Sequence, residues 1–377
     1  MTVKQIPVHM PALLVLLALF FLLPALSGIA ASDVVAVAAL VEGKVEAVSE
    51  SGERRTVLIG GQLRVGDTVE TFENARAVFA LSDGSRLDLS ESTVLEVNDV
   101  LPEEDSTSSF SLFLGRISII ALEMRGDDVV ITPNLTCGIR GTQFTVGVAE
   151  DGSSVVSVQE GEVAVYSPNQ GDEATAVPVS PGQEIAAEQA GEVLAARPAQ
   201  LADMEQWKQF SAARREKLLQ NLPEIVSRLE KGVDAQLERL DALKALPMDR
   251  ARVLKELREK LRGLPPDDKQ ARTRIIMRTH MEMAKTMGLV KNFRAQRMRL
   301  KSVFVRTRQL QQILPTVQDR LGGEYQGIAA SLEAISSREA QAQEQLRDLA
   351  QNFRQAMAPI QDDFQRYKQS LDQSCPQ

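Results

Sequence analysis

Few side chains in this sequence of 377 residues could catalyse a reaction. One histidine lies beyond the N-terminal segment: His280, between Thr279 and Met281 in a stretch of helix-forming residues. A lone histidine on a helix is usually a surface or packing residue, and it cannot form a metal site without clustered partners. The acidic residues include no distinctive pair of the kind that an enzyme acting on cell-wall polymer would need. We therefore predict that the protein is not an enzyme and has no catalytic residues, metal site or cofactor.

The two cysteines, Cys137 and Cys375, lie in different regions and lack metal-ligand spacing. Cys137 stands beside Gly138 in an apolar run, which predicts a small buried residue. An oxidising compartment would allow the two thiols to pair, and the sequence leaves that pairing open.

The densest cluster of unusual residues runs from Ile131 to Phe144. Pro133 ends an apolar run because it has no N–H to give to a strand ladder. Gly138 and Gly141 bracket a segment that contains Arg140, and glycine in a strand context indicates a bulge or bend. Either the arginine pairs with a carboxylate or with loop carbonyls and fixes that bend, or it presents its planar guanidinium to an anionic ligand or partner. The first interpretation is favoured, because a motif without geometry is weak support for a binding site.

Short alternating runs separated by turn signals predict β-strands from Asp33 to about Gln200. Asp83-Gly84 and Asp151-Gly152 each join two such runs, which predicts hairpins with type I′ turns. Glu160-Gly161 predicts a third chain reversal. Strands at this spacing indicate a sandwich or a small barrel-like pair of sheets rather than βαβ units. The predicted strands cover 41–48, 56–59, 68–71, 75–81, 85–89, 142–148, 154–159 and 162–166, with an acidic, Ser-rich loop at 102–109.

From about Ala199 onward, good helix formers replace glycine and β-branched residues. Helices are predicted at 201–222, 224–246 and 249–261, then from a cap at Asp267 or Asp268 to about 314, and from about 324 to 369. Pro223 lies in a first helical turn, Pro247 ends a helix, and Gly288 could interrupt the fourth one. Apolar residues recur at steps of three and four from Ile225 to Leu246, which places one stripe on a helix face. Such helices are stable when packed as a bundle or as coiled-coil hairpins.

The charge divides at the same boundary. Residues 32–199 contain 10 basic and 28 acidic residues, a net charge of −18, whereas residues 200–377 contain 32 basic and 23 acidic residues, a net charge of +9. The densest basic block lies between Arg272 and Arg308. It is either a solvated helix face that also docks on the acidic β-region, or a surface for anionic lipid or acidic cell-wall polymer. Nucleic acid is disfavoured as a partner because aromatic residues make up only 4% of the chain.

The N-terminus is typical of an export signal. Lys4 precedes an apolar run from Ala12 to Leu26, and the small residues of 27–31 follow. The run is short for a membrane span, although it could remain as an uncleaved anchor. We predict three parts: a signal peptide or anchor at 1–31, a β-domain at 32–199 and a helical domain at 200–377. The localisation would be the periplasm or another extracytoplasmic compartment.

Several separate motifs in the β-region resemble FecR-type domains in type and order, over about Val34 to Gln183. They include Gly66-Asp67-Thr68-Val69-Glu70-Thr71, Leu81-Ser82-Asp83-Gly84-Ser85, Thr132-Pro133-Asn134 and Ile139-Arg140-Gly141-Thr142-Gln143-Phe144. The resemblance implies a β-rich extracytoplasmic domain whose motif residues are structural. Those residues are Gly66, Asp67, Asp83, Gly84, Ser85, Pro133, Arg140, Gly141, Thr142 and Phe144. We thus expect a multidomain protein: an all-β, sandwich-like FecR-type domain followed by an all-α bundle or coiled-coil domain.

The best-known FecR proteins place this domain after a cytoplasmic anti-sigma segment and a transmembrane helix, and relay a receptor signal in iron uptake. Here only about ten residues precede the apolar segment, so we do not carry that mechanism over. The favoured expectation is an exported, non-enzymatic envelope protein. Its β-domain would bind an envelope protein or a cell-wall polymer, and its helices would serve as a spacer or form a homo-oligomer. The alternative is a membrane-anchored signalling subunit.

Overall fold

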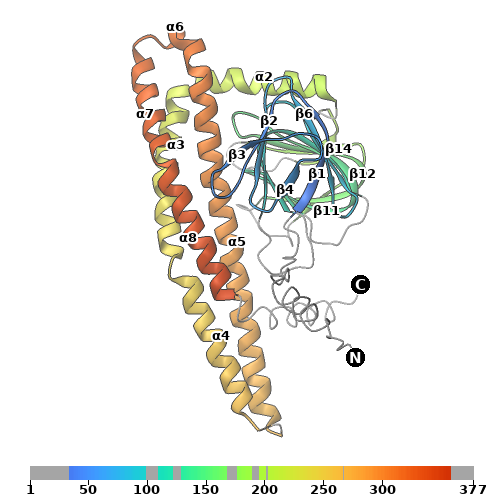
Figure 1. Ribbon diagram of the computed structural model, residues 1–377, viewed down its shortest axis with the longest axis vertical. Helices are drawn as coiled ribbons and strands as arrows, with labels where there is room; N and C mark the ends of the chain where they lie inside the picture. Colours follow the sequence, from blue (N-terminus) through green and yellow to red (C-terminus); the bar gives the residue numbers. More distant parts are fainter. Residues whose placement is uncertain are drawn as a thin grey trace, which may run out of the picture. The chain divides into compact units, whose positions relative to one another are not determined.

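The computed structural model describes residues 34–98, 109–121, 129–167, 176–188, 195–200, 203–265 and 267–357. Strands occupy the described chain as far as Pro198, and helices follow from Met204 (Figure 1). This order confirms the fold class, a β-rich region followed by an all-helical region. Internal contacts divide the chain into Met1–Val34 and Val35–Gln377, so the β-rich and helical regions share one compact unit.

Several expectations lie outside the described residues: the targeting segment, almost all of the acidic loop, Cys375 and the end of the last helix. The predicted domain limits stay a prediction.

In the described part of the chain, fifteen strands belong to one hydrogen-bonded network. Strand β9, of 12 residues, pairs with β8 and β10 near its start and with β7 and β11 near its end. The strands share a core that includes Phe79, Leu95, Ile117 and Phe144. The bounds are β1 Val34–Glu42, β2 Val45–Val48, β3 Arg54–Thr56, β4 Gln62–Arg64, β5 Thr68–Thr71, β6 Arg76–Leu81, β7 Arg86–Leu89, β8 Thr93–Val97, β9 Ser109–Ile120, β10 Val129–Ile131, β11 Thr136–Val148, β12 Ser154–Tyr166, β13 Val177–Val179, β14 Gln183–Ala187 and β15 Arg197–Pro198.

Both predicted Asp-Gly hairpins are present, since β6 pairs with β7 and β11 pairs with β12. The predicted turn type is wrong. A type I′ turn needs positive φ at both central residues, but here only the glycines have it, at 84° for Gly84 and 87° for Gly152. Each aspartate instead accepts the N–H of the serine two residues on, at 2.8 Å in the first turn and 2.9 Å in the second. This local hydrogen bond holds the aspartate in an Asx-type turn and leaves the positive φ to glycine.

The predicted reversal at Glu160-Gly161 is also wrong, because β12 runs through it. Gly161 has a φ of 77°, Gly141 on the paired strand has a φ of 58°, and the register shifts between Arg140 and Gln143. A Cβ on Gly161 would lie 2.5 Å from the carbonyl oxygen of Gly141. The two glycines thus make a β-bulge, which bends a strand without reversing it.

Three predicted strands have different limits. The strand predicted at 142–148 is only the second half of β11, which begins at Thr136. The run 41–48 divides into β1 and β2 because Gly43 makes a turn between them. Gly43 has a φ of 68°, and an added Cβ would lie only 2.9 Å from the Cα of Ala75. The strand predicted at 56–59 is β3, which ends at Thr56, and the following Leu58 and Ile59 are 68% and 69% exposed.

The helices are α2 Met204–Gln220, α3 Leu222–Leu243, α4 Leu246–Gly263, α5 Lys269–Ile313, α7 Tyr325–Ser337 and α8 Glu339–Met357. Three short turns lie between α5 and α7: η2 Leu314–Val317, α6 Gln318–Leu321 and η3 Gly322–Glu324. Asp268 caps α5 by accepting the N–H of Ala271 at 3.0 Å, as predicted. Pro223 lies in the first turn of α3, also as predicted.

Three details of the helices differ from the expectations. Helix α5 is continuous through Gly288, because one glycine costs a long packed helix only about 1 kcal/mol. Pro247 lies in the first turn of α4 rather than at the end of α3. A proline is tolerated in a first helical turn, because the N–H that it lacks would have no partner within the helix there. The single helix predicted from 324 is interrupted by a turn at Arg338, which separates α7 from α8.

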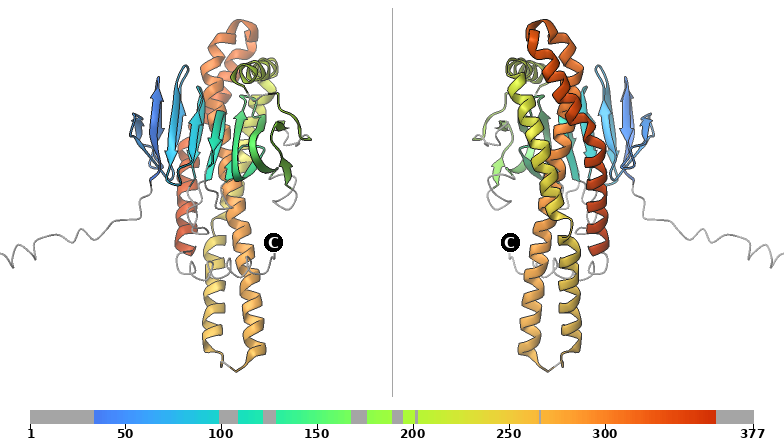
Figure 2. Two further views of the ribbon diagram at one scale, coloured as in Figure 1. Left: turned by 90° about the vertical axis from the view of Figure 1, so that its right-hand side faces the viewer. Right: turned by 90° about the vertical axis from the view of Figure 1, so that its left-hand side faces the viewer.

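The helical core joins α3, α5, α7 and α8 through residues such as Leu229, Leu240, Phe293 and Phe353. The predicted stripe of α3 forms part of it. Helix α4 and the first part of α5 run side by side as an antiparallel hairpin (Figures 1 and 2). Among the described helices, none has the length and apolar content needed to cross a bilayer.

Candidate functional site

The FecR-like motif residues are spread over several turns, where their contacts hold the backbone. Asp67 is 3% exposed and forms an ion pair with Arg55. Its Oδ2 also accepts the N–H of Arg64 at 2.8 Å, which closes the turn before β5. Gly66, with a φ of 86°, donates its N–H to the carbonyl oxygen of Val97 at 2.8 Å. This turn thereby connects β5 to the end of β8.

The same Asp-Gly-Ser arrangement occurs at both hairpins. In the first, Oδ2 of Asp83 accepts the hydroxyl of Ser85 at 2.9 Å, with Gly84 between them. In the second, Asp151 accepts the hydroxyl of Ser153, also at 2.9 Å. Each carboxylate thus holds its own turn, although Asp151 also pairs with Arg214 of α2.

The Thr132-Pro133-Asn134 motif forms a turn that is fastened to the second hairpin. The amide nitrogen of Asn134 donates to the carbonyl oxygens of Gly152 at 2.7 Å and Glu188 at 3.0 Å. Asn134-Leu135-Thr136 has the form of a glycosylation sequon. Asn134 is only 6% exposed, so this sequon is buried in the folded protein. Pro133 is half-buried at the tip of this turn.

At the bulge, Gly141 has open space around it, Thr142 is buried and Phe144 is fully enclosed in the β-core. The backbone of Arg140 lies opposite Glu162 in the β11–β12 ladder. Its side chain lies outside what the structure describes, so both interpretations of this arginine stay predictions.

A different set of residues assembles where α5 packs on the β-rich region. Glu96 of β8 is 1% exposed, and its Oε1 forms ion pairs with both Arg297 and Lys301 of α5. The ammonium nitrogen of Lys301 lies 2.6 Å from that oxygen. An apolar cluster surrounds the pairs, in which Val94, Phe113 and Leu114 of the strands contact Met298 and Val305 of α5. Part of the basic block therefore docks on the acidic β-region.

Opposing effects set the protonation of this cluster. Burial alone would raise the pKa of Glu96, but the positive charges of Arg297 and Lys301 outweigh it, so the pKa of this carboxyl lies below its ordinary value. Burial lowers the pKa of Lys301, and Glu96 opposes that effect. Two cations thus share one carboxylate, which leaves one uncompensated positive charge at the interface.

The lowered pKa of Glu96 predicts acid sensitivity of this docking contact. Its stabilisation is present above the ordinary carboxyl pKa of 4.5 and is lost as the pH falls below that value through the folded pKa. We expect the urea midpoint of the wild type to drop on acidification by more than that of Glu96→Gln. The comparison isolates Glu96 from the other carboxylates, which both proteins retain. Parallel pH profiles for the two proteins would contradict this expectation.

A second contact between the regions involves α2. Trp207 is 7% exposed and packs against Ala149 and Val155. Its ring also lies directly against Gly147, since a Cβ added to that glycine would be only 2.5 Å from the ring. Three ion pairs between α2 and the strand region lie near Trp207 in the sequence of α2. They are Lys208–Glu91 at 2.8 Å, Arg214–Asp151 at 3.6 Å and Arg215–Glu150 at 3.4 Å. The helical region therefore contacts the strands through α2 as well as through α5.

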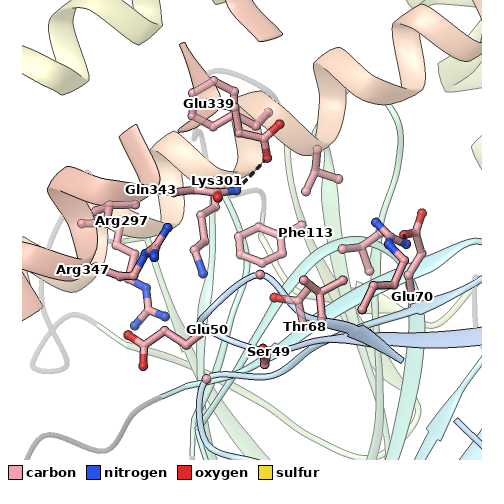
Figure 3. Close-up of a pocket in the computed structure, with 18 of the residues that line it drawn as sticks. Ser49, Glu50, Thr68, Glu70, Phe113, Arg297, Lys301, Glu339, Gln343 and Arg347 are labelled. Carbon is pink, nitrogen blue, oxygen red and sulfur yellow. Dashed lines mark hydrogen bonds and ion pairs between the residues drawn. The ribbon is translucent and has the colours of Figure 1, made fainter. Parts of the chain in front are cut away.

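A cavity of about 130 Å³ opens beside the Glu96 cluster, between the β2–β5 side of the strands and helices α5 and α8. Figure 3 shows Lys301 and Arg297 directed into it from α5, with Phe113 on the strand side and Glu50 across from the arginines. Arg347 and Gln343 of α8 line its helical side, and the amide of Gln343 donates to Glu339 at 3.1 Å. The cavity combines an apolar wall with a cationic one, an arrangement that can hold an anionic group.

The residues considered for catalysis lie elsewhere. His280 is half-buried on α5. Cys137 is fully buried, as predicted, and burial raises the pKa of its thiol to about 12. In the part of the chain that the structure describes, His, Cys, Asp and Glu form no group able to hold a metal ion.

Sequence reasoning missed Glu96 and found its partners only as members of a basic block. A usable signal exists for the carboxylate, because it is the single charge in the run Thr93-Val94-Leu95-Glu96-Val97. A charge inside an apolar strand needs a buried partner.

Comparison with known proteins places these residues in context. Residues 67–164 match the family model described as "FecR protein", which confirms the resemblance over the centre of the β-region. No curated protein matches the chain. A solved crystal structure of a "putative anti-sigma factor" from Parabacteroides distasonis ATCC 8503 is 20% identical with a TM-score of 0.30, and the match covers 35% of this chain and 59% of that chain. A solved "cell surface anchoring domain" is 22% identical with a TM-score of 0.17, and covers 17% and 86%.

Proposed function

We propose that the protein is a non-enzymatic component of the cell envelope that binds another envelope protein. The proposal starts from the match of residues 67–164 to the FecR family. FecR-type proteins are envelope-associated and regulatory. The β-rich region would provide the recognition surface and the helices a spacer or an oligomerisation module. The targeting segment predicted at 1–31 would direct export.

The observation that carries this proposal is an exposed apolar pair in the β3–β4 loop. Leu58 and Ile59 are 68% and 69% exposed, and the neighbouring Val37 of β1 is 39% exposed. The loop is held in place, because the N–H of Gly60 donates to Ala38 and the N–H of Ala38 donates to Gly61, both at 2.8 Å. Exposed apolar side chains that lie together in one patch mark protein–protein contacts, whereas single ones are common on any surface. Apolar contact favours a protein over a cell-wall polymer.

The test places a photo-crosslinking residue at Leu58 in the producing cell, with Ser51 as a matched exposed position. We expect a discrete adduct from position 58 alone. The purified adduct partner should then bind the wild type and lose at least about tenfold in affinity with Leu58→Asp, about 1.4 kcal/mol, whereas Ser51→Asp should bind like the wild type. Identical adducts from both positions, or equal binding by both variants, would refute the proposal.

A second candidate is a membrane-anchored signalling subunit. The interface favours it, because one buried carboxylate with two cations joins the recognition region to the helices. A partner that disturbs this cluster would change the docking of the helices, the kind of two-state element that a relay needs. Mass spectrometry of the mature N-terminus separates the candidates: a chain that starts near residue 31 or 32 excludes the anchored version.

A further inference from the structure

The cavity beside Glu96 has an excess of positive charge on its helical side. Arg297 and Lys301 share one carboxylate. Arg308 and Arg347 also line the cavity, and neither forms an ion pair with any described residue. These cations come from two helices, α5 and α8, and converge on one small volume.

Acidic groups on the lining only partly balance them. Arg54 pairs with Glu46 at 2.5 Å and with Glu70 at 3.5 Å. Glu50 lies 3.7 Å from Arg354 while facing the cavity arginines (Figure 3). Five cationic and three acidic side chains line the space, and Glu96 behind the wall reduces the excess to one positive charge. A single negative charge would complete the site.

The rest of the lining is apolar. Val94 and Phe113 come from the strands, and Phe304, Val305, Leu346 and Ala350 come from the helices. A free inorganic anion would leave this wall without a partner, whereas a neutral apolar molecule would leave the arginines unused. The lining thus requires an apolar body and an anionic head in one molecule.

We propose that this cavity binds a small organic monoanion, such as a carboxylate on a compact ring or short aliphatic group. The volume of about 130 Å³ is close to that of an engineered cavity of about 150 Å³ that accepts benzene. The apolar body fits against Phe113 and Leu346, and the carboxylate lies toward Arg297, Lys301 and Arg347. This inference goes beyond the proposed function, because the site lies apart from the β3–β4 loop and links the FecR-type domain to α8.

The experiment titrates the full mature chain with 4-fluorobenzoate and follows its fluorine resonance by NMR. We expect saturable binding that benzoate displaces, at least about tenfold weaker binding of neutral 4-fluorobenzyl alcohol, and no displacement by inorganic phosphate at equal concentration. Arg347→Gln should weaken fluorobenzoate about tenfold without changing the alcohol, because an exposed rim charge is lost. Gln343→Trp, which fills the mouth from the surface of α8, should abolish binding of both.

The control is Arg278→Gln, an exposed arginine of α5 that does not line the cavity. It should bind fluorobenzoate like the wild type. Absence of saturable binding, equal affinity for the acid and the alcohol, or binding that survives both cavity variants would each overturn the proposal. Displacement by phosphate as effective as that by benzoate would overturn the organic class of ligand. Circular dichroism of each variant confirms that it is folded.

Discussion

The variant Glu96→Gln is expected to lose about 3–4 kcal/mol of the free energy of unfolding, since removing one partner of a buried ion pair leaves the other charge uncompensated. Here two cations, Arg297 and Lys301, would lose their shared carboxylate. The lower half of the usual range applies, because the Lys301 side chain is still 25% exposed. Urea denaturation measures the loss. Hydrogen exchange should show faster exchange in β8 and in the facing part of α5.

Glu216→Gln is the matched control. This carboxylate also pairs with an arginine, Arg320 at 3.2 Å, but both side chains are about half exposed. Water and salt screen such a pair, so its removal should change stability little. Equal effects of the two substitutions would contradict the assignment of Glu96 as the central docking residue. Replacing Glu96, Arg297 and Lys301 together with apolar residues should restore much of the loss, because no buried charge then remains unpaired.

The substitution Gly115→Ala is expected to cost about 3 kcal/mol or more, because backbone strain and overpacking act together. Gly115 lies in β9 with a φ of 86°, and an added Cβ would lie 2.5 Å from the Cα of Thr93 and 2.7 Å from the carbonyl oxygen of Ser92. Backbone atoms cannot move aside as a flexible side chain can. Strand β8 would have to separate from β9, and Glu96 lies on β8 only three residues beyond Thr93.

Gly141→Ala separates the two contributions. Gly141 has a φ of 58°, but an added Cβ would meet no atom within 4 Å, so only the backbone strain of about 1–2 kcal/mol remains. Chemical denaturation of both variants should therefore give a clearly larger loss for position 115. Similar losses at the two positions would show that the contact with Thr93 is relieved at little cost. Hydrogen exchange in α5 should rise only in Gly115→Ala.

The sequence predicted local features well where a few neighbouring residues decide them. The strand Thr68–Thr71, the helix cap at Asp268 and the apolar stripe of α3 were all found, since alternation, capping and helical spacing act within one or two turns of chain. The errors lie where a segment distant in the chain decides the local structure. Gly43 ends a strand, whereas Gly161 only bends one. The difference depends on the segment that packs beside each glycine, Asn74-Ala75 in the first case and Gly141-Thr142 in the second.

By itself, the sequence determined the order of a β-rich and a helical region, the opposite charges of the two, and the resemblance to FecR-type domains. Only the tertiary structure decided which charges meet. Glu96 is separated by 201 residues from Arg297 and by 205 from Lys301, and no periodicity or motif connects positions so distant. Their pairing depends on which face of α5 packs on β8 and β9. The cavity exists for the same reason, because its wall is shared by strands and helices that become neighbours only when the chain has folded.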